Sequence, residues 1–231
     1  YTIEARTGLG YRLTAAPDAL VEREIRRHLP ENIPCPQLRC MAEIDSTNSY
    51  LKREALAGAP HGTVAVANYQ TAGRGRMSRA FLSPPDRGVY LSVLLRPPLP
   101  PEALLGATGM AAVAVCNAVE RVSGVRPGIK WTNDLVLNGK KLCGILTEMA
   151  LEGETGMTEY LVIGAGVNVS HSREDFGPEV ADMATSLALE GYSVSRSALA
   201  AAMIEELFRL SDCLGGDCGD WVAAYRRACV T

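Results

Sequence analysis

The chain has 231 residues, of which 47% are hydrophobic and 21% are charged, so it can form one large globular domain or one domain with a small appendage. Its formal net charge of −3 excludes a global basic field that recruits nucleic acid, and any anion site must therefore be local. No apolar run approaches the roughly 20 residues of a membrane span and no signal peptide opens the chain, so we expect a cytoplasmic protein without a membrane partner.

Cysteine and histidine usage argues against a disulfide framework and against a metal centre. The seven cysteines are an odd number and include no Cys-x-x-Cys pair, a pattern typical of reduced thiols. The three histidines are scattered, so we expect no metal-ligating residues. The chain begins with Tyr1 rather than Met, and we therefore expect further residues upstream.

The first 37 residues are predicted to precede the main domain. Residues 1–13 read as two short strands around a Gly8–Gly10 turn. Such a hairpin is too small to be stable alone, so it is interpreted as the end of something larger, and the wing of a winged-helix domain is one candidate. A linker over residues 14–37 contains a helix, expected at residues 18–29, and then a proline-rich connector.

From residue 38 onward, strand-like and helical segments follow one another. Ser46 is placed to cap a helix that ends near Ala57, and Asn138-Gly139 is a strong signal for a type I′ hairpin. Strands are expected at residues 38–44, 63–68, 88–95, 128–131, 135–137, 141–148 and 160–169, and further helices at 102–123, 184–189, 196–211 and 217–229. This order predicts an α+β fold, a mostly antiparallel sheet with helices packed on one side.

Between the second and third of these strands lies a loop rich in glycine and arginine, residues 70–79. Gly73 and Gly75 permit close backbone approach, so that successive N–H groups can converge on an anion. Arg74, Arg76 and Arg79 add planar donors suited to carboxylate or phosphate. The loop has no Walker A ending, and by itself it indicates only an anion site, with a solvated basic loop as the alternative.

A second group of polar residues follows the strand near Ile129. Lys130 lies at the end of an apolar strand, where we expect its charge to be partly desolvated and to need a carboxylate or phosphate partner, with a lysine that extends its ammonium to solvent as the alternative. Asn133 and Asp134 suit a nucleotide or Mg²⁺, while Lys141 is expected to be a surface charge. Because no Ser-His-Asp or Cys-His set can be assembled, the pattern favours a protein that positions substrates and stabilises phosphate charge.

Five motifs in this order resemble those of the catalytic domain of biotin protein ligases, over roughly residues 38–231. They are Asp-Ser-Thr-Asn (45–48), Gln-Thr-Ala-Gly-Arg-Gly-Arg (70–76), Lys-Trp-Thr-Asn-Asp (130–134), Lys-Leu-Cys-Gly-Ile-Leu-Thr-Glu (141–148) and Gly-Ala-Gly-Val-Asn (164–168). Two positions depart from the family, which commonly has Pro where Thr132 stands and often Gly where Ser78 stands. The resemblance implies the family's class II synthetase-like fold.

The resemblance also implies a reaction in two steps. Biotin and ATP give biotinyl-5′-adenylate and pyrophosphate, and the biotin is then transferred to a lysine of a biotin carboxyl carrier domain. Mg²⁺ would accompany ATP. By position, the biotin-binding residues would be Ser46, Thr47, Asn48, Gln70, Arg74, Gly75, Arg76, Lys130 and Gly144, those on the adenylate side Arg76, Arg79, Asn133 and Asn168, and those in catalysis Lys130, Arg74 and Arg76.

The ends of the chain resemble parts of the family as well. Residues 1–13 look like the last hairpin of an N-terminal winged-helix domain, and the chain stops about where such ligases enter a small C-terminal β-barrel. DNA is expected as a partner only with an upstream winged-helix domain, and a homodimer is left open. The alternatives are a lipoate–protein ligase, a biotin-responsive transcriptional repressor with ligation as a further activity, and a non-catalytic biotin- or nucleotide-binding protein.

Overall fold

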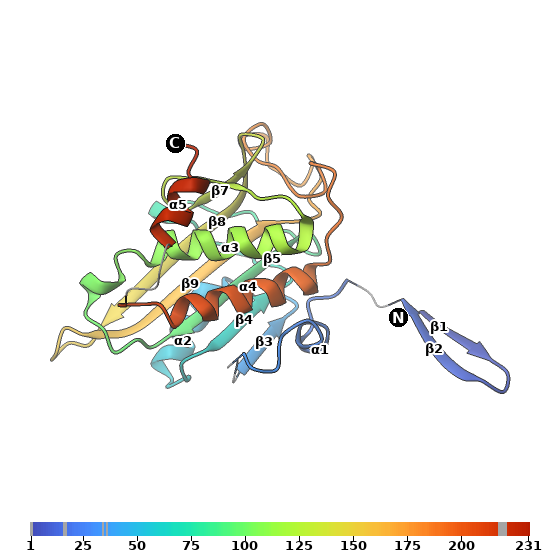
Figure 1. The fold of residues 1–231 in the computed structure, drawn as a ribbon, viewed down its shortest axis with the longest axis horizontal. Coiled ribbons are helices and arrows are strands. Elements are labelled where there is room, and N and C mark those ends of the chain that lie inside the picture. The colour runs from blue at the N-terminus through green and yellow to red at the C-terminus, as the bar shows by residue number, and fades with distance from the viewer. Residues whose placement is uncertain (1, 16–17, 34, 36, 217–220) are drawn as a thin grey trace.

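The computed structural model describes residues 2–15, 18–33, 35, 37–216 and 221–231. Its first two strands, β1 (Thr2–Arg6) and β2 (Gly10–Ala15), form an antiparallel hairpin that pairs with no other described strand. Figure 1 shows the hairpin projecting from the body of the protein, and its residues 3–12 are exposed. The predicted hairpin is thus confirmed, whereas its origin in a winged-helix domain stays a prediction.

The body is built on one seven-stranded sheet with the order β3-β4-β5-β9-β8-β7-β6. The strands are β3 (Gln37–Met41), β4 (Thr63–Ala67), β5 (Gly88–Leu95), β6 (Gly128–Lys130), β7 (Asp134–Leu137), β8 (Lys140–Leu151) and β9 (Thr158–Asn168). Among these described strands β3 and β4 run parallel, and every other neighbouring pair is antiparallel. This confirms the predicted α+β fold with a mostly antiparallel sheet.

A tight turn joins β7 to β8, as the sequence predicted. Asn138 and Gly139 have φ angles of 50° and 77°, the left-handed values that both central residues of a type I′ turn require. The turn pairs Leu137 with Lys140, and a register shift between Leu135 and Val136 then places Asp134 opposite Gly144.

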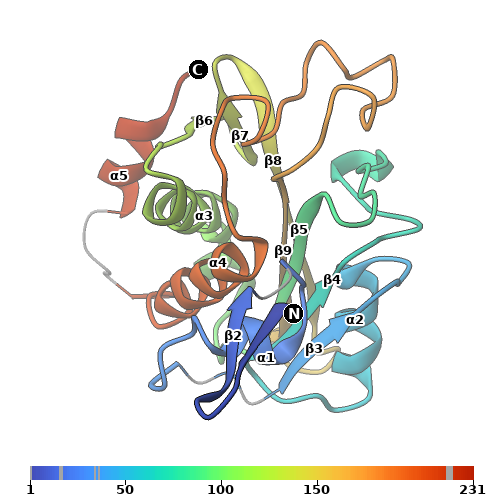
Figure 2. The same ribbon diagram turned by 90° about the vertical axis from the view of Figure 1, so that its right-hand side faces the viewer.

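The helices lie on both faces of the sheet, whereas the sequence predicted helices on one face only. The helices α1 (Glu22–Arg26), α3 (Ala107–Ser123), α4 (Arg196–Ser211) and α5 (Trp221–Ala228) gather on one face, and α2 (Thr47–Leu56) lies on the other (Figure 2). The helix expected at 18–29 is shorter than predicted. No helix forms at 184–189, where Ala184 makes an isolated bridge with Lys141 and a turn follows at residues 187–191. Residues 217–220 of the helix expected at 217–229 lie outside the described residues.

The segment Pro101–Ser123, a 3₁₀ turn followed by α3, is long and apolar enough by composition to span a membrane. The expectation that no such run exists is therefore wrong. The position of α3 supplies the reason for its composition: it packs against the sheet, α4 and α5, and its buried residues, among them Ala111, Val115 and Val119, are fully enclosed in the core. A helix that is apolar all round is expected in such a place.

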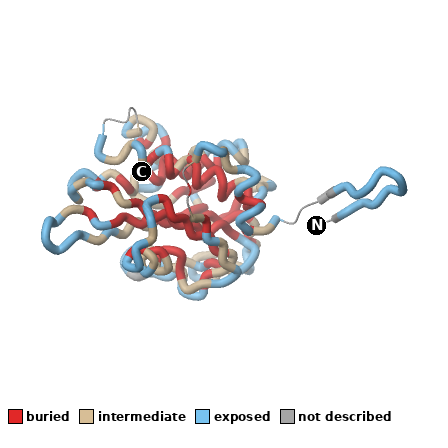
Figure 3. The backbone as a smooth tube through the Cα atoms, turned by 90° about the horizontal axis from the view of Figure 1, so that it is seen from below, coloured by how far each residue is buried: buried red, intermediate tan, exposed pale blue. Residues whose placement is uncertain are grey.

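Along β5 the side chains alternate strictly between the two faces of the sheet, and these faces differ in character. On β5, Val89, Leu91, Val93 and Leu95 join the main core with α3 and α4, while Leu94 joins a second, smaller core under α2. Tyr90 and Ser92, between them, point to the α2 face with Leu94 because successive strand residues face opposite sides. Figure 3 shows the buried residues concentrated along the sheet and the helices beside it.

Candidate functional site

The floor of a narrow cavity on the α2 face is made of three glycines. Gly144 pairs with Gly166 across β8 and β9, and Gly164 lies two residues before Gly166 on the same face. Tyr90 pairs with Gly166 and Ser92 with Gly164, so the glycines continue the rows of polar side chains on β5. A Cβ atom at Gly166 would overlap the ring of Phe81, and one at Gly164 would overlap the Asn48 side chain. The close approaches therefore require glycine.

The first turn of α2 forms one wall of this cavity. Ser46 adopts an extended conformation and accepts a hydrogen bond from the Ser49 N–H at 3.5 Å, which is the capping arrangement that starts the helix. Thr47 and Asn48 follow, and both are buried toward the sheet. The N–H of Thr47 donates to Gln70 Oε1 at 2.8 Å, so the four predicted residues Ser46, Thr47, Asn48 and Gln70 are brought together at one cavity.

The glycine- and arginine-rich loop covers the cavity. Gly75 donates its N–H to the Arg79 carbonyl at 2.8 Å, which closes a short turn at Arg76–Ser78. The guanidinium of Arg76 donates to Thr132 Oγ1 at 2.8 Å and to Asn133 Oδ1 at 3.0 Å. Arg74, Gly75, Arg76 and Asn133 all line the cavity together with Gly144, whereas Arg79 is exposed and lies outside the set of described lining residues.

Arg74 is held by a carboxylate. Its guanidinium lies 3.4 Å from Glu148, which also receives hydrogen bonds from Lys52 at 2.9 Å and from Asn48 at 3.0 Å. Burial alone would raise the pKa of Glu148, but the hydrogen bonds from Lys52 and Asn48 and the charge of Arg74 hold it below its usual value. Glu148 is therefore ionised and fixes both Arg74 and Asn48.

The structure changes the expectations for two lysines. Lys130, predicted to be partly desolvated and paired, is exposed at the end of the edge strand β6, and within the described residues its ammonium has no ion-pair partner. Lys141, predicted to be a surface charge, is half-buried, lines the cavity and pairs with Asp134 at 2.9 Å. The cause is an irregularity in the β7–β8 pairing, where Leu135 and Val136 pair with Cys143 and Lys141.

That bulge turns both Leu142 and Cys143 into the main core and leaves Lys141 on the same face as Gly144. Asn168 is also placed differently from the expectation. It is buried, its Nδ2 donates to the Thr185 carbonyl at 3.0 Å, and it lies outside the described residues that line the cavity.

Several residues of the site were not singled out from the sequence. Phe81 covers the glycine floor, meets Tyr90 edge to face at 6.5 Å and lies 5.9 Å from the Lys141 ammonium. With this ring in place the cavity holds only about 50 Å³. Alternation along β5 was the available signal for Tyr90 and Ser92, because it places both on one face.

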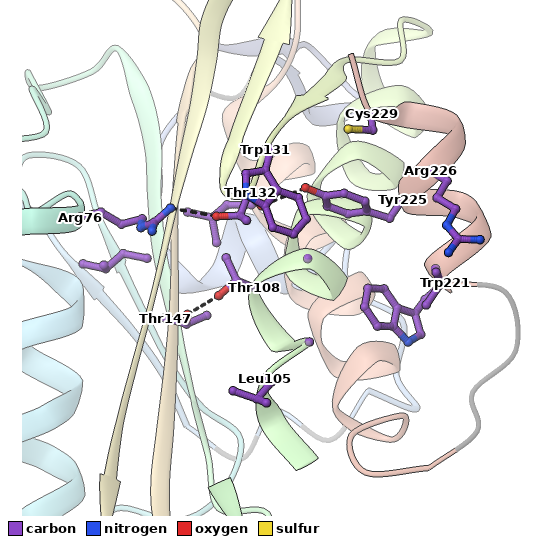
Figure 4. Close-up of a pocket in the computed structure, with 15 residues that line it drawn as sticks. Arg76, Leu105, Thr108, Trp131, Thr132, Thr147, Trp221, Tyr225, Arg226 and Cys229 are labelled. Carbon is purple, nitrogen blue, oxygen red and sulfur yellow. Dashed lines mark hydrogen bonds between the residues drawn. The ribbon is translucent and has the colours of Figure 1, made fainter. Parts of the chain in front are cut away.

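A larger cavity of about 700 Å³ lies on the opposite side of the sheet, between β8, α3 and α5 (Figure 4). Its wall is aromatic: Trp131 meets Tyr225 edge to face at 6.1 Å, and Trp221 stands beside Arg226. Arg76 lines both cavities, and its hydrogen bond to Thr132 lies at their boundary. The guanidinium can therefore exchange neutral acceptors for a charged ligand at this boundary.

A mixed sheet with a glycine floor, converging hydrogen-bonding groups and an arginine loop forms a site whose chemistry suits a small polar ligand with an anionic group. Residues 40–168 match the sequence profile of the Biotin/lipoate A/B protein ligase family, and the chain belongs to that family.

Two curated relatives and one solved structure support this assignment. The chain is 42% identical over 187 residues to the bifunctional ligase/repressor BirA of Bacillus spizizenii, covering 81% of this chain and 57% of that protein. It is 36% identical over 177 residues to a biotin–[acetyl-CoA-carboxylase] ligase of Mycobacterium tuberculosis, covering 74% of this chain and 62% of the relative. The biotin protein ligase of Aquifex aeolicus in complex with biotin and ATP superposes with a TM-score of 0.61 at 27% identity, over 76% of this chain and 70% of that one. The chain thus spans little more than half the length of these curated relatives.

Proposed function

We propose that this chain is the catalytic part of an ATP-dependent biotin–protein ligase that works in the cytoplasm. It makes biotinyl-5′-adenylate and pyrophosphate from biotin and ATP, and then transfers biotin to a lysine of a carboxylase carrier domain. The observation that carries this proposal is the smaller cavity, where the hydrogen-bonding groups of Thr47 and Gln70 and the arginines of the loop surround a glycine floor. A bicyclic urea with a carboxylate tail is complementary to these groups.

In the proposed first step, a carboxylate oxygen of biotin attacks the α-phosphorus of ATP, the bond to the bridging oxygen breaks and pyrophosphate leaves. Arg74 and Arg76 supply planar donors for the carboxylate and phosphate oxygens, with the Gly75 backbone between them. Lys130 swings from the neighbouring strand end toward the charge that builds up at phosphorus, because its ammonium is not committed to an ion pair among the described residues.

The remaining positions bind the parts of the ligand that do not react. Ser46, Thr47 and Gln70 hydrogen-bond the ureido ring, and Gly144 leaves room for the ring. Asn133 lies on the adenylate side, and Arg79 joins it there when the ligand orders the loop. Asn168, which lies at the end of β9 and not on the loop, supports this side through its hydrogen bond to the Thr185 carbonyl. In the second step the carrier lysine amine attacks the acyl carbon and AMP leaves, so that an amide replaces the mixed anhydride.

Magnesium enters with ATP in this proposal. Among the described residues there is no group of three or more His, Cys, Asp or Glu side chains that could hold a metal ion. The phosphate oxygens of ATP would therefore supply most of its ligands, as is common for Mg²⁺ at nucleotide sites.

A second role concerns the full-length protein. The Bacillus relative is named a bifunctional ligase/repressor, and the projecting β1–β2 hairpin fits the last hairpin of a winged-helix domain. DNA binding, with homodimer formation, is proposed only for a protein that carries such a domain upstream.

The test incubates the protein with ATP, Mg²⁺ and either biotin or lipoate, and measures pyrophosphate release and bound acyl-adenylate. We expect release with biotin, and none with lipoate because lipoate lacks the N–H and C=O groups of a urea. A reaction without either acid is the control for ATP hydrolysis. Equal release with both acids, or none with biotin, would overturn the proposal.

A further inference from the structure

Behind the proposed ligand-contacting residues lies a buried relay of hydrogen bonds, and its central member is Ser92. This side chain is fully buried in the middle of β5 and lies outside the described residues that line the cavities. Its hydroxyl is 2.7 Å from Thr47 Oγ1 and 2.6 Å from Asn48 Oδ1. Because it has one proton and two short oxygen neighbours, the direction of each hydrogen bond can be worked out.

Asn48 determines that direction. Its Nδ2 group lies 3.2 Å from the Leu146 carbonyl and 3.0 Å from Glu148 Oε2, so both of its hydrogens have acceptors. The reverse orientation of the amide would place its oxygen against two acceptors, one of them charged. Asn48 Oδ1 therefore faces Ser92, and as an acceptor it must receive the Ser92 proton.

The direction of the Thr47 hydroxyl follows from that of Ser92. Since Ser92 donates to Asn48, it has to accept the proton of Thr47 Oγ1. Thr47 Oγ1 also lies 3.2 Å from Gln70 Oε1, but that oxygen already accepts the shorter bond from the Thr47 N–H. Donating to Gln70 instead would leave the bare oxygens of Ser92 and Thr47 facing each other at 2.7 Å, which is the costlier arrangement.

Thr47 Oγ1 is thus left with its lone pairs, and it lines the cavity. Beside it, Gln70 Nε2 donates to Ser83 Oγ at 2.8 Å, and its second hydrogen has no acceptor among the described residues. The wall therefore presents an acceptor next to a donor. An N–H adjacent to a C=O, as in a cyclic urea, satisfies both groups.

We propose that Ser92 is a positioning residue that makes the Thr47 hydroxyl an acceptor toward the ligand, so that the site selects acids whose ring carries an N–H. The proposal rests on the function proposed above and names the chemical feature by which the same cavity discriminates. It also gives Gly164 a role, because any side chain there would overlap the Asn48 oxygen that receives the Ser92 proton.

The experiment compares binding of biotin with binding of its cyclic carbonate analogue, in which oxygens replace both ring N–H groups, by titration calorimetry without ATP. The wild-type protein should bind biotin at least about tenfold more tightly than the carbonate, since the Thr47 acceptor then faces a ring oxygen of the carbonate and receives no hydrogen bond. Ser92→Ala should bring this ratio close to one, and Ser92→Thr, which keeps the hydroxyl, should restore it.

Two further variants separate this role from a merely structural one. Ser186→Ala removes another fully buried serine hydroxyl, which donates to the His171 carbonyl, and should leave the ratio unchanged. Thr47→Val combined with Ser92→Ala should lose no more selectivity than Thr47→Val alone, because Ser92 acts through Thr47.

The possible failures are distinct. A wild-type protein that does not bind biotin contradicts the proposed function itself. A wild-type protein that binds biotin but accepts the carbonate equally well, or a Ser92→Ala variant that loses affinity for both ligands in equal proportion, overturns the role of Ser92 alone. The wild-type ratio needs no variant, so the proposal stays testable if Ser92→Ala does not fold.

Discussion

The two faces of the sheet use the same strands for different purposes. Toward α3 and α4, residues such as Leu91 and Ile163 are fully buried in a continuous apolar core. Toward α2, the neighbouring positions are Ser92, which belongs to the buried relay of hydrogen bonds, and Gly164, which forms part of the cavity floor. Because alternate residues of a strand face opposite sides, substitutions one residue apart should have different consequences. Changes on the helical face should lower stability, and changes on the α2 face should lower binding or rate.

The largest effect is expected at Lys130, beside the α2 face. Lys130→Ala should lower the rate of pyrophosphate release by about two to three decades, because a charge that stabilises the transition state is worth roughly 3–4 kcal/mol. Stability should hardly change, since the side chain is exposed. The measurement is a pyrophosphate assay beside a thermal melt, with Lys140→Ala as the control on the next lysine-bearing strand. A variant that keeps more than half of the wild-type rate would remove Lys130 from catalysis.

On the helical side, Arg196 should show the opposite pattern. Its side chain is only 5% exposed and bonds the carboxylate of Asp18 at 3.1 Å, Asn68 at 2.9 Å and Asp86 at 3.3 Å. Arg196→Ala should lower the free energy of unfolding by about 3 kcal/mol, the lower end for a broken buried pair because the two carboxylates left behind can reach water.

Urea denaturation measures this change. Arg26→Ala is the control, since this arginine is 43% exposed, its partner Glu22 is 52% exposed, and such a surface ion pair should contribute less than about 1 kcal/mol. Equal losses in the two variants would mean that burial of Arg196 adds nothing. A loss of biotin affinity in proportion to the loss of stability would mean that Arg196 also supports the binding site, contrary to the expected difference between the two faces.

Much of this contrast was predictable, and the failures have physical causes. The capping residue Ser46, the Asn138-Gly139 turn and the strand alternation are local signals, and they placed α2 and β8 correctly. The hydrophobic pattern of the sequence does not predict the bulge that brings Lys141 into the cavity. The contact between Ser92 and Asn48 joins residues 44 positions apart, and no local sequence pattern predicts it.

A titration on the α2 side should give the next largest effect. His171 is buried, its Nε2 lies 3.3 Å from the Tyr90 hydroxyl, and its ring stacks on Phe176. Burial lowers the pKa of His171 to about 4, opposed by the Asp175 carboxylate and assisted by Arg87. Unfolded histidine titrates near 6.5, so the unfolded state binds the extra proton between these values.

Stability should therefore be complete above about pH 6.5 and fall as the pH drops toward 4, with His171 contributing up to about 2–3 kcal/mol of that loss. Urea unfolding at several pH values measures it. His171→Phe, which preserves a ring for stacking, should flatten the curve across this window. An unchanged slope in that variant would assign the acid sensitivity to the carboxylates instead.

The smallest effect is expected at Phe81, where the α2 face is closed. The ring covers Gly144 and Gly166 and leaves a cavity of about 50 Å³, too small for a bicyclic ligand, so the ring has to move before biotin can bind. Its edge-to-face contact with Tyr90 is of a kind worth about 0.5–1.5 kcal/mol, which opposes that movement.

Phe81→Ala removes this cost and should raise the association rate of biotin about two- to tenfold. Stopped-flow fluorescence of the two tryptophans reports the rate, because Trp131 and Trp221 line the larger cavity, which shares Arg76 with this one. Leu82→Ala is the control, because Leu82 is on the same loop but outside the described lining of this cavity. An association rate that stays the same or falls in Phe81→Ala would show that the ring is part of the binding surface and does not have to be displaced.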